Sequence, residues 1–211
     1  MTGEVYLDEL ERDALTELVN IGVSRAAASL RKMVSKQVLL SVPSVEIVTR
    51  ASAAALIGQR ESEDLIAVQQ QFDGAFSGRA LLMFPESNGL RLVRAMVGDD
   101  MEQDEVVSME SEALAEAGNV ILNGCLGSMA NMLQQSLKMT LPDVRRGNSE
   151  MLFDVASNPV EESFVLFLYI NFSVRDRDIR GYIAMILDLP SLEILKQLIA
   201  AFVERVTQDT P

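Results

Sequence analysis

Two stretches of the chain each place an asparagine three residues after a glutamate. The pairs are Glu17 with Asn20 and Glu116 with Asn119. On a helix, residues three apart lie one above the other on the same face, so each pair would form a short polar stripe. A carboxylate and a carboxamide can hold a ligand by hydrogen bonds. One such pair alone is typical of an ordinary solvated helix surface.

The two pairs recur in register with a third kind of residue, a proline. The glutamates, the asparagines and the prolines Pro43 and Pro142 are each 99 positions apart (17 to 116, 20 to 119 and 43 to 142). Composition does not force this agreement, and an internal repeat indicates duplicated structure. The period is too long for a solenoid, so the pattern predicts two related halves of one domain.

The composition narrows the chemistry that the chain can perform. Because there is no histidine, sites built on a histidine base or on histidine metal ligands are excluded. The single cysteine, Cys125, excludes an intrachain disulfide and a cysteine zinc site. No glycine-rich phosphate-binding loop is present. Any catalysis must therefore use carboxylates, amides, hydroxyls, lysine, arginine or groups of a partner protein.

Charge and hydropathy limit the partners and the location. The net charge of −13 argues against nucleic acid or an anionic membrane as the main partner. No apolar run approaches the roughly 18 residues that a membrane span needs. The acidic N-terminal stretch has no signal-peptide pattern. We therefore expect a cytoplasmic protein without a membrane span.

The remaining patterns predict the elements that would position the two stripes. Helices are expected at about 8–35, 51–57, 88–97, 109–137 and 190–206. Strands are expected at 38–40, 45–49, 65–72, 78–84, near 142, and at 150–155, 164–172 and 179–187. Asp8 is the expected N-cap of the first helix. The charged segment 99–105 is expected to be a solvated linker.

Each half therefore consists of a helix, strand material, a hairpin and a second helix. We expect an α+β fold in a single domain of residues 1–211, with internal repeats at approximately 8–98 and 107–206. The apolar faces of two small sheets are most simply buried when the sheets join into one continuous sheet covered by helices. The two long helices would then pack side by side on that sheet, with both stripes facing outward.

At these residues the chain resembles the chemotaxis phosphatase family that includes CheC, CheX and FliY. The pattern of that family is Asp/Ser-x3-Glu-x2-Asn-x22-Pro, and two intact Glu/Asn pairs look more like CheC than like single-site relatives. The first copy fits throughout, at Asp13, Glu17, Asn20 and Pro43. The second copy fits at Glu116, Asn119 and Pro142, but has Glu112 where the pattern has Asp or Ser.

The resemblance implies a phosphatase that acts on the aspartyl phosphate of the phosphorylated response regulator CheY. The catalytic residues would be Glu17, Asn20, Glu116 and Asn119. The asparagines would position the attacking water, and the glutamates would bind the active-site lysine of the receiver domain. The receiver would hold the Mg²⁺, so no cofactor or metal is expected in this chain. Supporting roles would fall to Asp13, Glu112, Pro43 and Pro142, and CheD is a further candidate partner.

Two other functions stay open on the sequence alone. The chain could be a non-catalytic module that binds a phosphorylated receiver, or CheD, and regulates it. A weaker alternative is an inert duplicated scaffold, for which the matched Glu/Asn pairs would be a coincidence. A double variant, Asn20→Ala with Asn119→Ala, separates the phosphatase from the non-catalytic module, because an enzyme would lose hydrolysis while keeping its binding to the receiver.

Overall fold

The computed structural model of the chain describes residues 7–34, 38–42, 45–98, 101–155, 163–174 and 177–208. Its helices are α1 (Glu9–Val34), α2 (Arg50–Gly58), α3 (Glu86–Val97), α4 (Gln103–Met132), α5 (Ser149–Leu152) and α6 (Leu189–Gln208). Its strands are β1 (Val38–Ser41), β2 (Val45–Thr49), β3 (Leu65–Gly74), β4 (Gly78–Pro85), β5 (Leu137–Met139), β6 (Asp143–Gly147), β7 (Ser163–Val174) and β8 (Arg177–Asp188). The described residues up to 98 are called the first half, and those from 101 onward the second half.

The strands form one antiparallel, eight-stranded sheet in the order β1, β7, β8, β4, β3 and β5, with β2 also paired to β7 and β6 also paired to β3. The two halves exchange their outer strands. Strands β1 and β2 of the first half pair with β7, and β5 and β6 of the second half pair with β3. Val45 pairs with Leu168 and Val144 pairs with Val68, so the exchange follows the same register at both ends. The expectation of one continuous sheet is confirmed.

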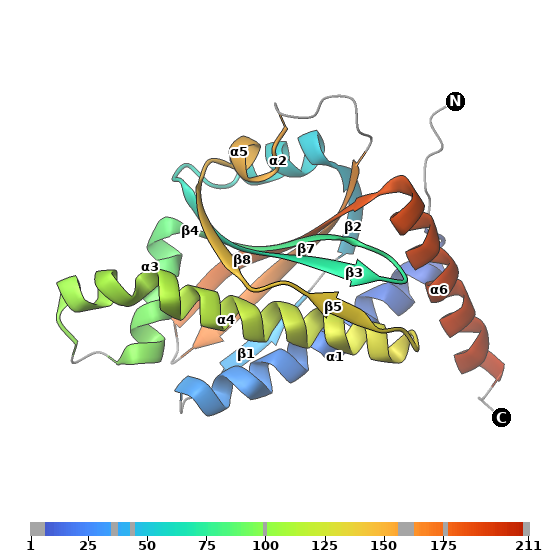
Figure 1. The fold of residues 1–211 in the computed structure, drawn as a ribbon, viewed down its shortest axis with the longest axis horizontal. Coiled ribbons are helices and arrows are strands. Elements are labelled where there is room, and N and C mark those ends of the chain that lie inside the picture. Colours follow the sequence, from blue (N-terminus) through green and yellow to red (C-terminus); the bar gives the residue numbers. More distant parts are fainter. Residues whose placement is uncertain are drawn as a thin grey trace.

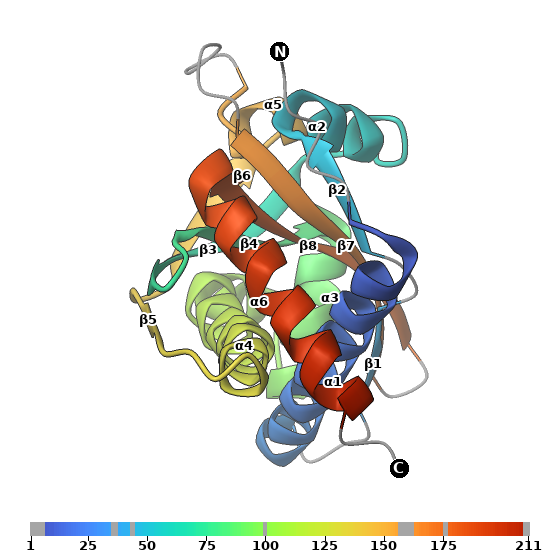
Figure 2. The same ribbon diagram turned by 90° about the vertical axis from the view of Figure 1, so that its right-hand side faces the viewer.

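The two long helices α1 and α4 lie side by side on one face of this sheet (Figure 1). Glycines bring their backbones close together. A Cβ atom added at Gly22 would lie 2.9 Å from Cα of Cys125, and one added at Gly124 would lie 2.9 Å from Cβ of Ala26. Helix α6 packs against α1 at one end of this layer, on the side facing the viewer in Figure 2. The expected pairing of two long helices on the sheet is confirmed.

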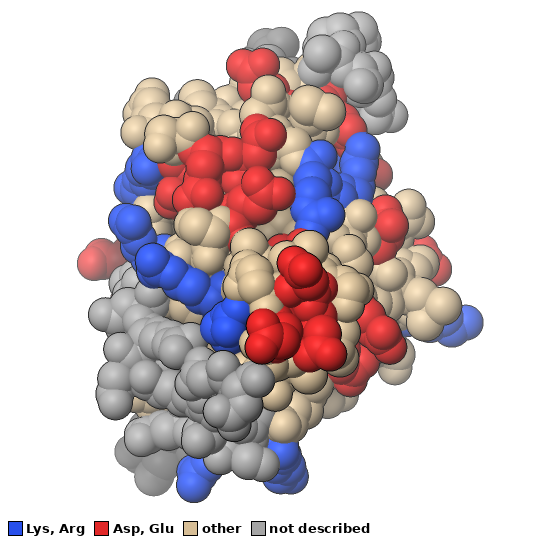
Figure 3. Space-filling model, turned by 90° about the vertical axis from the view of Figure 1, so that its left-hand side faces the viewer, with Lys and Arg blue, Asp and Glu red and all other residues tan. Residues whose placement is uncertain are grey.

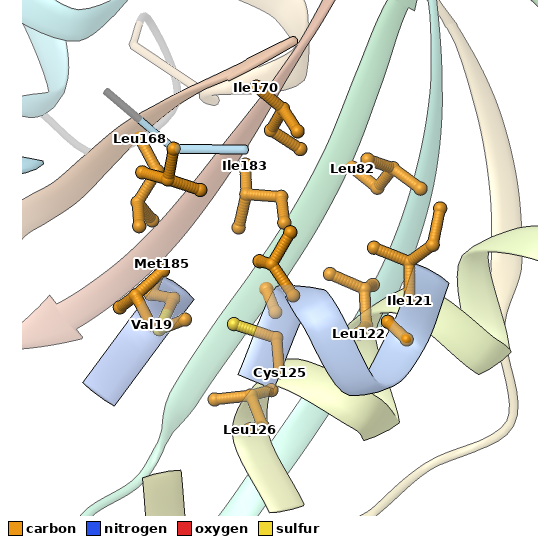
Figure 4. Packing of buried hydrophobic residues seen from close by; sticks show 14 of the residues in the cluster. Val19, Leu82, Ile121, Leu122, Cys125, Leu126, Leu168, Ile170, Ile183 and Met185 are labelled. Atoms are coloured by element: carbon orange, nitrogen blue, oxygen red, sulfur yellow. The ribbon is translucent and has the colours of Figure 1, made fainter. Parts of the chain in front are cut away.

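The main core lies between these helices and the sheet. Figure 4 shows Val19 of α1 and Leu122 and Cys125 of α4 beside Ile183 and Met185 of β8. All five residues are buried. The apolar face of each helix is thus covered by sheet side chains, which is the arrangement that an amphipathic helix on a half-buried sheet requires.

The opposite face of the sheet carries a smaller core under α2 and α5 (Figure 1). Phe167 and Tyr182 stack there at 5.9 Å between ring centroids. The hydroxyl of Tyr182 donates to a carboxylate oxygen of Glu61. Burial together with this hydrogen bond raises the pKa of Tyr182 far above its ordinary value.

None of the helices among the described residues combines the length and the apolar character that a membrane-spanning helix needs.

Local signals explain where the first helix starts. The backbone N–H of Glu11 donates to Oδ1 of Asp8 at 2.8 Å, and the N–H of Asp8 donates to Oε2 of Glu11 at 2.9 Å. This reciprocal pair is a capping box, which satisfies two N–H groups that have no partner within the helix. The prediction of Asp8 as the N-cap is confirmed.

Two predicted elements differ from the structure. Helix α4 runs from Gln103 to Met132, where the sequence predicted about 109–137, so part of the expected linker 99–105 is helical. Residues 150–155 do not form a strand. The short helix α5 begins here instead, because Oδ1 of Asn148 accepts the N–H of Met151 at 2.9 Å and caps the first turn.

Candidate functional site

The first Glu/Asn pair lies on α1, where the helix passes the end of β1. Glu17 is exposed and Asn20 is half-buried. Oδ1 of Asn20 accepts the backbone N–H of Val42 at 3.1 Å. Because an N–H group can only face the oxygen of a carboxamide, this bond fixes which way the amide points. One lone pair of Oδ1 and the Nδ2 group have no partner among the described residues.

The second pair lies on α4 and has a different set of partners. Glu116 is exposed and Asn119 is half-buried, as in the first pair. Oδ1 of Asn119 accepts two hydrogen bonds, from Nε2 of Gln70 at 3.1 Å and from Nδ2 of Asn123 at 2.5 Å. A carboxamide oxygen has two lone pairs, so both are in use here.

Gln70 is a residue of the candidate site that sequence reasoning missed. It belongs to β3 of the first half, and its Nε2 also donates to the backbone oxygen of Thr140 at 2.9 Å. Thr140 is fixed in turn by the residue that follows Gln70, because the N–H of Thr140 donates to the backbone oxygen of Gln71 at 2.9 Å. A signal was present in the sequence. Alternate residues of a strand share a face, so Gln70 is a polar residue on the same face as the apolar Val68 and Phe72.

The two sites therefore differ in their support although their helices match. Val42 and Leu141 stand 99 positions apart, just before the two prolines. Val42 is buried and its N–H binds Asn20, whereas Leu141 is 89% exposed. In the second site a side-chain amide from the other half donates in place of that backbone N–H. The glutamates of both stripes face outward, whereas each asparagine is half-buried and is held by a residue in the sheet or directly after a strand.

The supporting residues lie in or near the same surfaces. Asp13 and Glu112 are exposed on α1 and α4, and neither side chain has a hydrogen-bond partner among the described residues. Pro142 is half-buried between β5 and β6. Pro43, its counterpart, lies outside the described residues. The supporting roles stay predictions.

A second pair of glutamates recurs at the same offset but is buried. Glu11 and Glu110 stand six residues before Glu17 and Glu116. Oε2 of Glu11 lies 3.8 Å from Nζ of Lys196, and Oε2 of Glu110 accepts from Arg146. A buried carboxylate needs a partner of this kind. These acids therefore belong to the support of the helices and not to the exposed stripes.

Acidic side chains are also concentrated away from the two Glu/Asn pairs. Figure 3, viewed from the side of α3 and the start of α4, shows two acidic groups. Exposed acids occur at the start of α4, and a hollow of about 370 Å³ between α2 and α5 is lined in part by Glu61, Glu63, Asp64 and Glu150. Such a surface favours a partner with basic side chains over an anion.

Cys125 does not add a nucleophile to either site. It is fully buried under α1, and burial raises the pKa of its thiol to about 12. A thiol with so high a pKa stays protonated and unreactive near neutral pH.

Among the described residues, no cluster of histidine, cysteine or acidic side chains is placed to hold a metal ion.

Comparison with known families matches both helices that carry the pairs. The family model described as "Chemotaxis phosphatase CheX" matches residues 66–164, which include Gln70, Glu116 and Asn119. The model described as "CheC-like family" matches residues 10–47, which include Glu17 and Asn20. Each match covers one candidate site.

Curated relatives are similar over long stretches at low identity. The chain is 26% identical to the flagellar motor switch phosphatase FliY of Bacillus subtilis over 140 residues, which is 65% of this chain but only 36% of that protein. It is 21% identical to the CheY-P phosphatase CheC of the same organism over 197 residues, which is 90% of this chain and 93% of that protein.

Solved structures share the architecture. FliY from Thermotoga maritima aligns with a TM-score of 0.71 and 17% identity, covering 93% of this chain and 98% of that one. The middle domain of FliM from Vibrio alginolyticus aligns with a TM-score of 0.63 and 14% identity, covering 87% and 99%. At such identities, these two likenesses concern the fold alone.

Proposed function

Since the chain belongs to the CheC/CheX/FliY family of chemotaxis phosphatases, we propose that it hydrolyses the aspartyl phosphate of a phosphorylated CheY-like receiver domain. The relative from B. subtilis that covers most of the chain is named a CheY-P phosphatase. The single cysteine, which is free and buried, suits the reducing cytoplasm in which such a reaction would occur.

In the proposed reaction, water attacks phosphorus and the bond between phosphorus and the aspartyl oxygen breaks. The proton lost by the water goes to the phosphate, and the aspartate leaves as a carboxylate. An acyl phosphate is already reactive, so the main task is to place the water in line with the leaving oxygen. The free lone pair on Oδ1 of Asn20 can accept a hydrogen bond from that water, while the bond to Val42 holds the amide still.

The glutamates have a different proposed role. Glu17 and Glu116 are exposed one turn before the asparagines, where each can reach a lysine of the docked receiver. A carboxylate–ammonium hydrogen bond would orient the two proteins. The receiver would also supply the Mg²⁺ that neutralises the phosphoryl oxygens, so this chain contributes geometry and not a metal.

The observation that carries the proposal is the repeated arrangement of an exposed glutamate and an anchored, half-buried asparagine. The test is phosphate release from a phosphorylated receiver, with and without CheD. We expect Asn20→Ala and Asn119→Ala each to lower the rate in part and the double variant to abolish it. Asn131→Ala, at an exposed position near the end of α4, is the matched control. An unsubstituted chain that does not accelerate spontaneous decay would contradict the proposal.

A non-catalytic regulator is the second candidate, and one observation favours it. Both lone pairs on Oδ1 of Asn119 are already used, which leaves the second site less able to accept a water. Such a module would bind a beryllofluoride-activated receiver, or CheD, without phosphate release. Pull-down with that receiver, measured beside hydrolysis, decides between the two functions.

A further inference from the structure

Gln70 places a polar side chain where the strand otherwise faces an apolar core. Only 1% of the residue is exposed. Alternate residues of a strand share a face, so Gln70 points to the same side as Val68 and Phe72, which belong to the core beneath α1 and α4. Burying a carboxamide there costs free energy unless its polar atoms are paired.

The pairing of Gln70 is one-sided. Its Nε2 donates to Oδ1 of Asn119 at 3.1 Å and to the backbone oxygen of Thr140 at 2.9 Å. Its Oε1 is buried and has no hydrogen-bond partner within the described ranges. A buried, unpaired oxygen lowers stability, and an apolar residue of similar size would avoid that cost. Packing alone therefore does not explain a glutamine here.

The other half of the sheet shows the apolar alternative at the corresponding position. Phe72 pairs with Met139, and Phe172 pairs with Leu40, which stands 99 positions before Met139. Gln70 lies two residues before Phe72 on β3, and Ile170 lies two residues before Phe172 on β7. Gln70 and Ile170 therefore occupy corresponding positions in the two halves. Ile170 is buried in the main core (Figure 4). The first site needs no side-chain donor at this point, because the N–H of Val42 holds Asn20.

We propose that Gln70 is a positioning residue of the second site, where its side-chain amide does for Asn119 what the backbone N–H of Val42 does for Asn20. This inference rests on the proposed function. Nε2 can only donate, so it fixes Oδ1 of Asn119 toward the sheet and sets the plane of the carboxamide. The second lone pair is occupied by the exposed Asn123, which a docking partner can displace.

The second site is thereby assembled from both halves. Glu116, Asn119 and Thr140 come from the second half, and Gln70 comes from β3 of the first. Gln70 does not contact the substrate in this proposal. It acts through Asn119, so its removal should disturb the rate of the chemical step more than the affinity for the receiver.

The test measures the second site alone, in a chain carrying Asn20→Ala. Gln70→Met keeps the length and burial of the side chain but removes the donor. We expect kcat to fall about tenfold with KM changed by less than about twofold, because a misplaced group affects the reaction more than binding. The Tm should change little, because the loss of two hydrogen bonds is offset by the removal of a buried unpaired oxygen. Gln70→Ile, which copies Ile170, serves if the methionine packs poorly.

Two controls separate positioning from general damage. In a chain carrying Asn119→Ala, Gln70→Met should leave kcat unchanged, because Asn20 is held by Val42. Gln71→Met alters the adjacent glutamine, which is exposed and contacts Thr140 through its backbone, and should leave the second site active.

Four outcomes decide against the inference. Full activity of Gln70→Met in the Asn20→Ala chain overturns it, and so does an equal loss in both backgrounds. An Asn20→Ala chain without activity, beside an active Asn119→Ala chain, overturns it while leaving hydrolysis by the first site intact. An inactive unsubstituted chain overturns the inference and the proposed function together.

Discussion

Oδ1 of Asn20 is anchored to the backbone N–H of Val42 at 3.1 Å, so the orientation of this asparagine depends on the main chain. Substitutions of neighbouring strand side chains should leave it in place. The same oxygen retains one lone pair, which gives the first site an acceptor that does not have to be freed before a water can bind.

This anchor predicts the effect of Asn20→Asp. A carboxylate can accept the N–H of Val42 at least as well, so the Tm should be nearly unchanged. Hydrolysis by the first site should fall about a hundredfold, because a negative charge would face the phosphoryl oxygens. Phosphate release in the Asn119→Ala chain measures it. A variant as active as the unsubstituted site would show that Asn20 does not lie beside the phosphoryl group, as the proposed placement of the water requires.

A second prediction concerns Asn123, which occupies a lone pair of Asn119 at 2.5 Å. Asn123→Ala frees that lone pair for a water. In a chain carrying Asn20→Ala, kcat should rise about threefold, which is the size expected for one exposed hydrogen bond that no longer has to be broken. Ser24→Ala, 99 positions earlier, is the matched control and should change little. A fall in kcat would instead show that Asn123, like Gln70, helps to hold the side chain of Asn119 in place.

A third prediction concerns the contact between the two long helices. A Cβ at residue 22 would lie 2.9 Å from both Cα and O of Cys125, and neither backbone atom can move without shifting α4. Gly22→Ala should lower the free energy of unfolding by about 1–3 kcal/mol, as overpacking does. Urea unfolding measures this. Gly127→Ala is the control, because nothing lies within 4 Å of its added Cβ, and it should stabilise α4 by about 0.5–1 kcal/mol.

A fourth prediction follows from the buried thiol. Burial raises the pKa of Cys125 from 9.0 to about 12, so the folded protein keeps the thiol protonated where the unfolded chain ionises it. Its contribution to stability is complete below pH 9 and is lost as the pH rises from 9 to about 12. At pH 8 a thiol reagent should react only after urea unfolds the chain. Cys125→Ala, compared over the same pH range, removes this part of the pH dependence, and rapid labelling of the folded chain would contradict the prediction.

Local signals in the sequence were enough to predict most elements. Asp8 and Glu11 mark the start of α1 within four residues, and short apolar runs mark the hairpin strands on either side of 73–77. After Gly147 the prediction of a strand at 150–155 is wrong, because Asn148 caps a helix there. The signal for this helix is local, since an asparagine directly before the first helical residue is an N-cap.

The candidate site was predictable only in part. The spacing identified Glu17, Asn20, Glu116 and Asn119 as candidates, and their assignment to catalysis stays a prediction, as do the repeat limits 8–98 and 107–206. The partner of Asn119 was not predictable, because Gln70 and Asn119 belong to different halves, which meet through the exchange of strands. No local pattern records which strand lies beside a given helix.

The exchange of strands also determines when the sites can form during synthesis. Val45 pairs with Leu168, so β1 and β2 have no neighbour in the sheet until β7 has left the ribosome. Pairings between residues so far apart in the sequence are slow to form, and strand edges are prone to aggregation until they are paired. A nascent chain therefore carries Glu17, Asn20 and the anchoring Val42 long before β7 can pair with β1 and β2, so the first site is completed only after most of the polypeptide has been made.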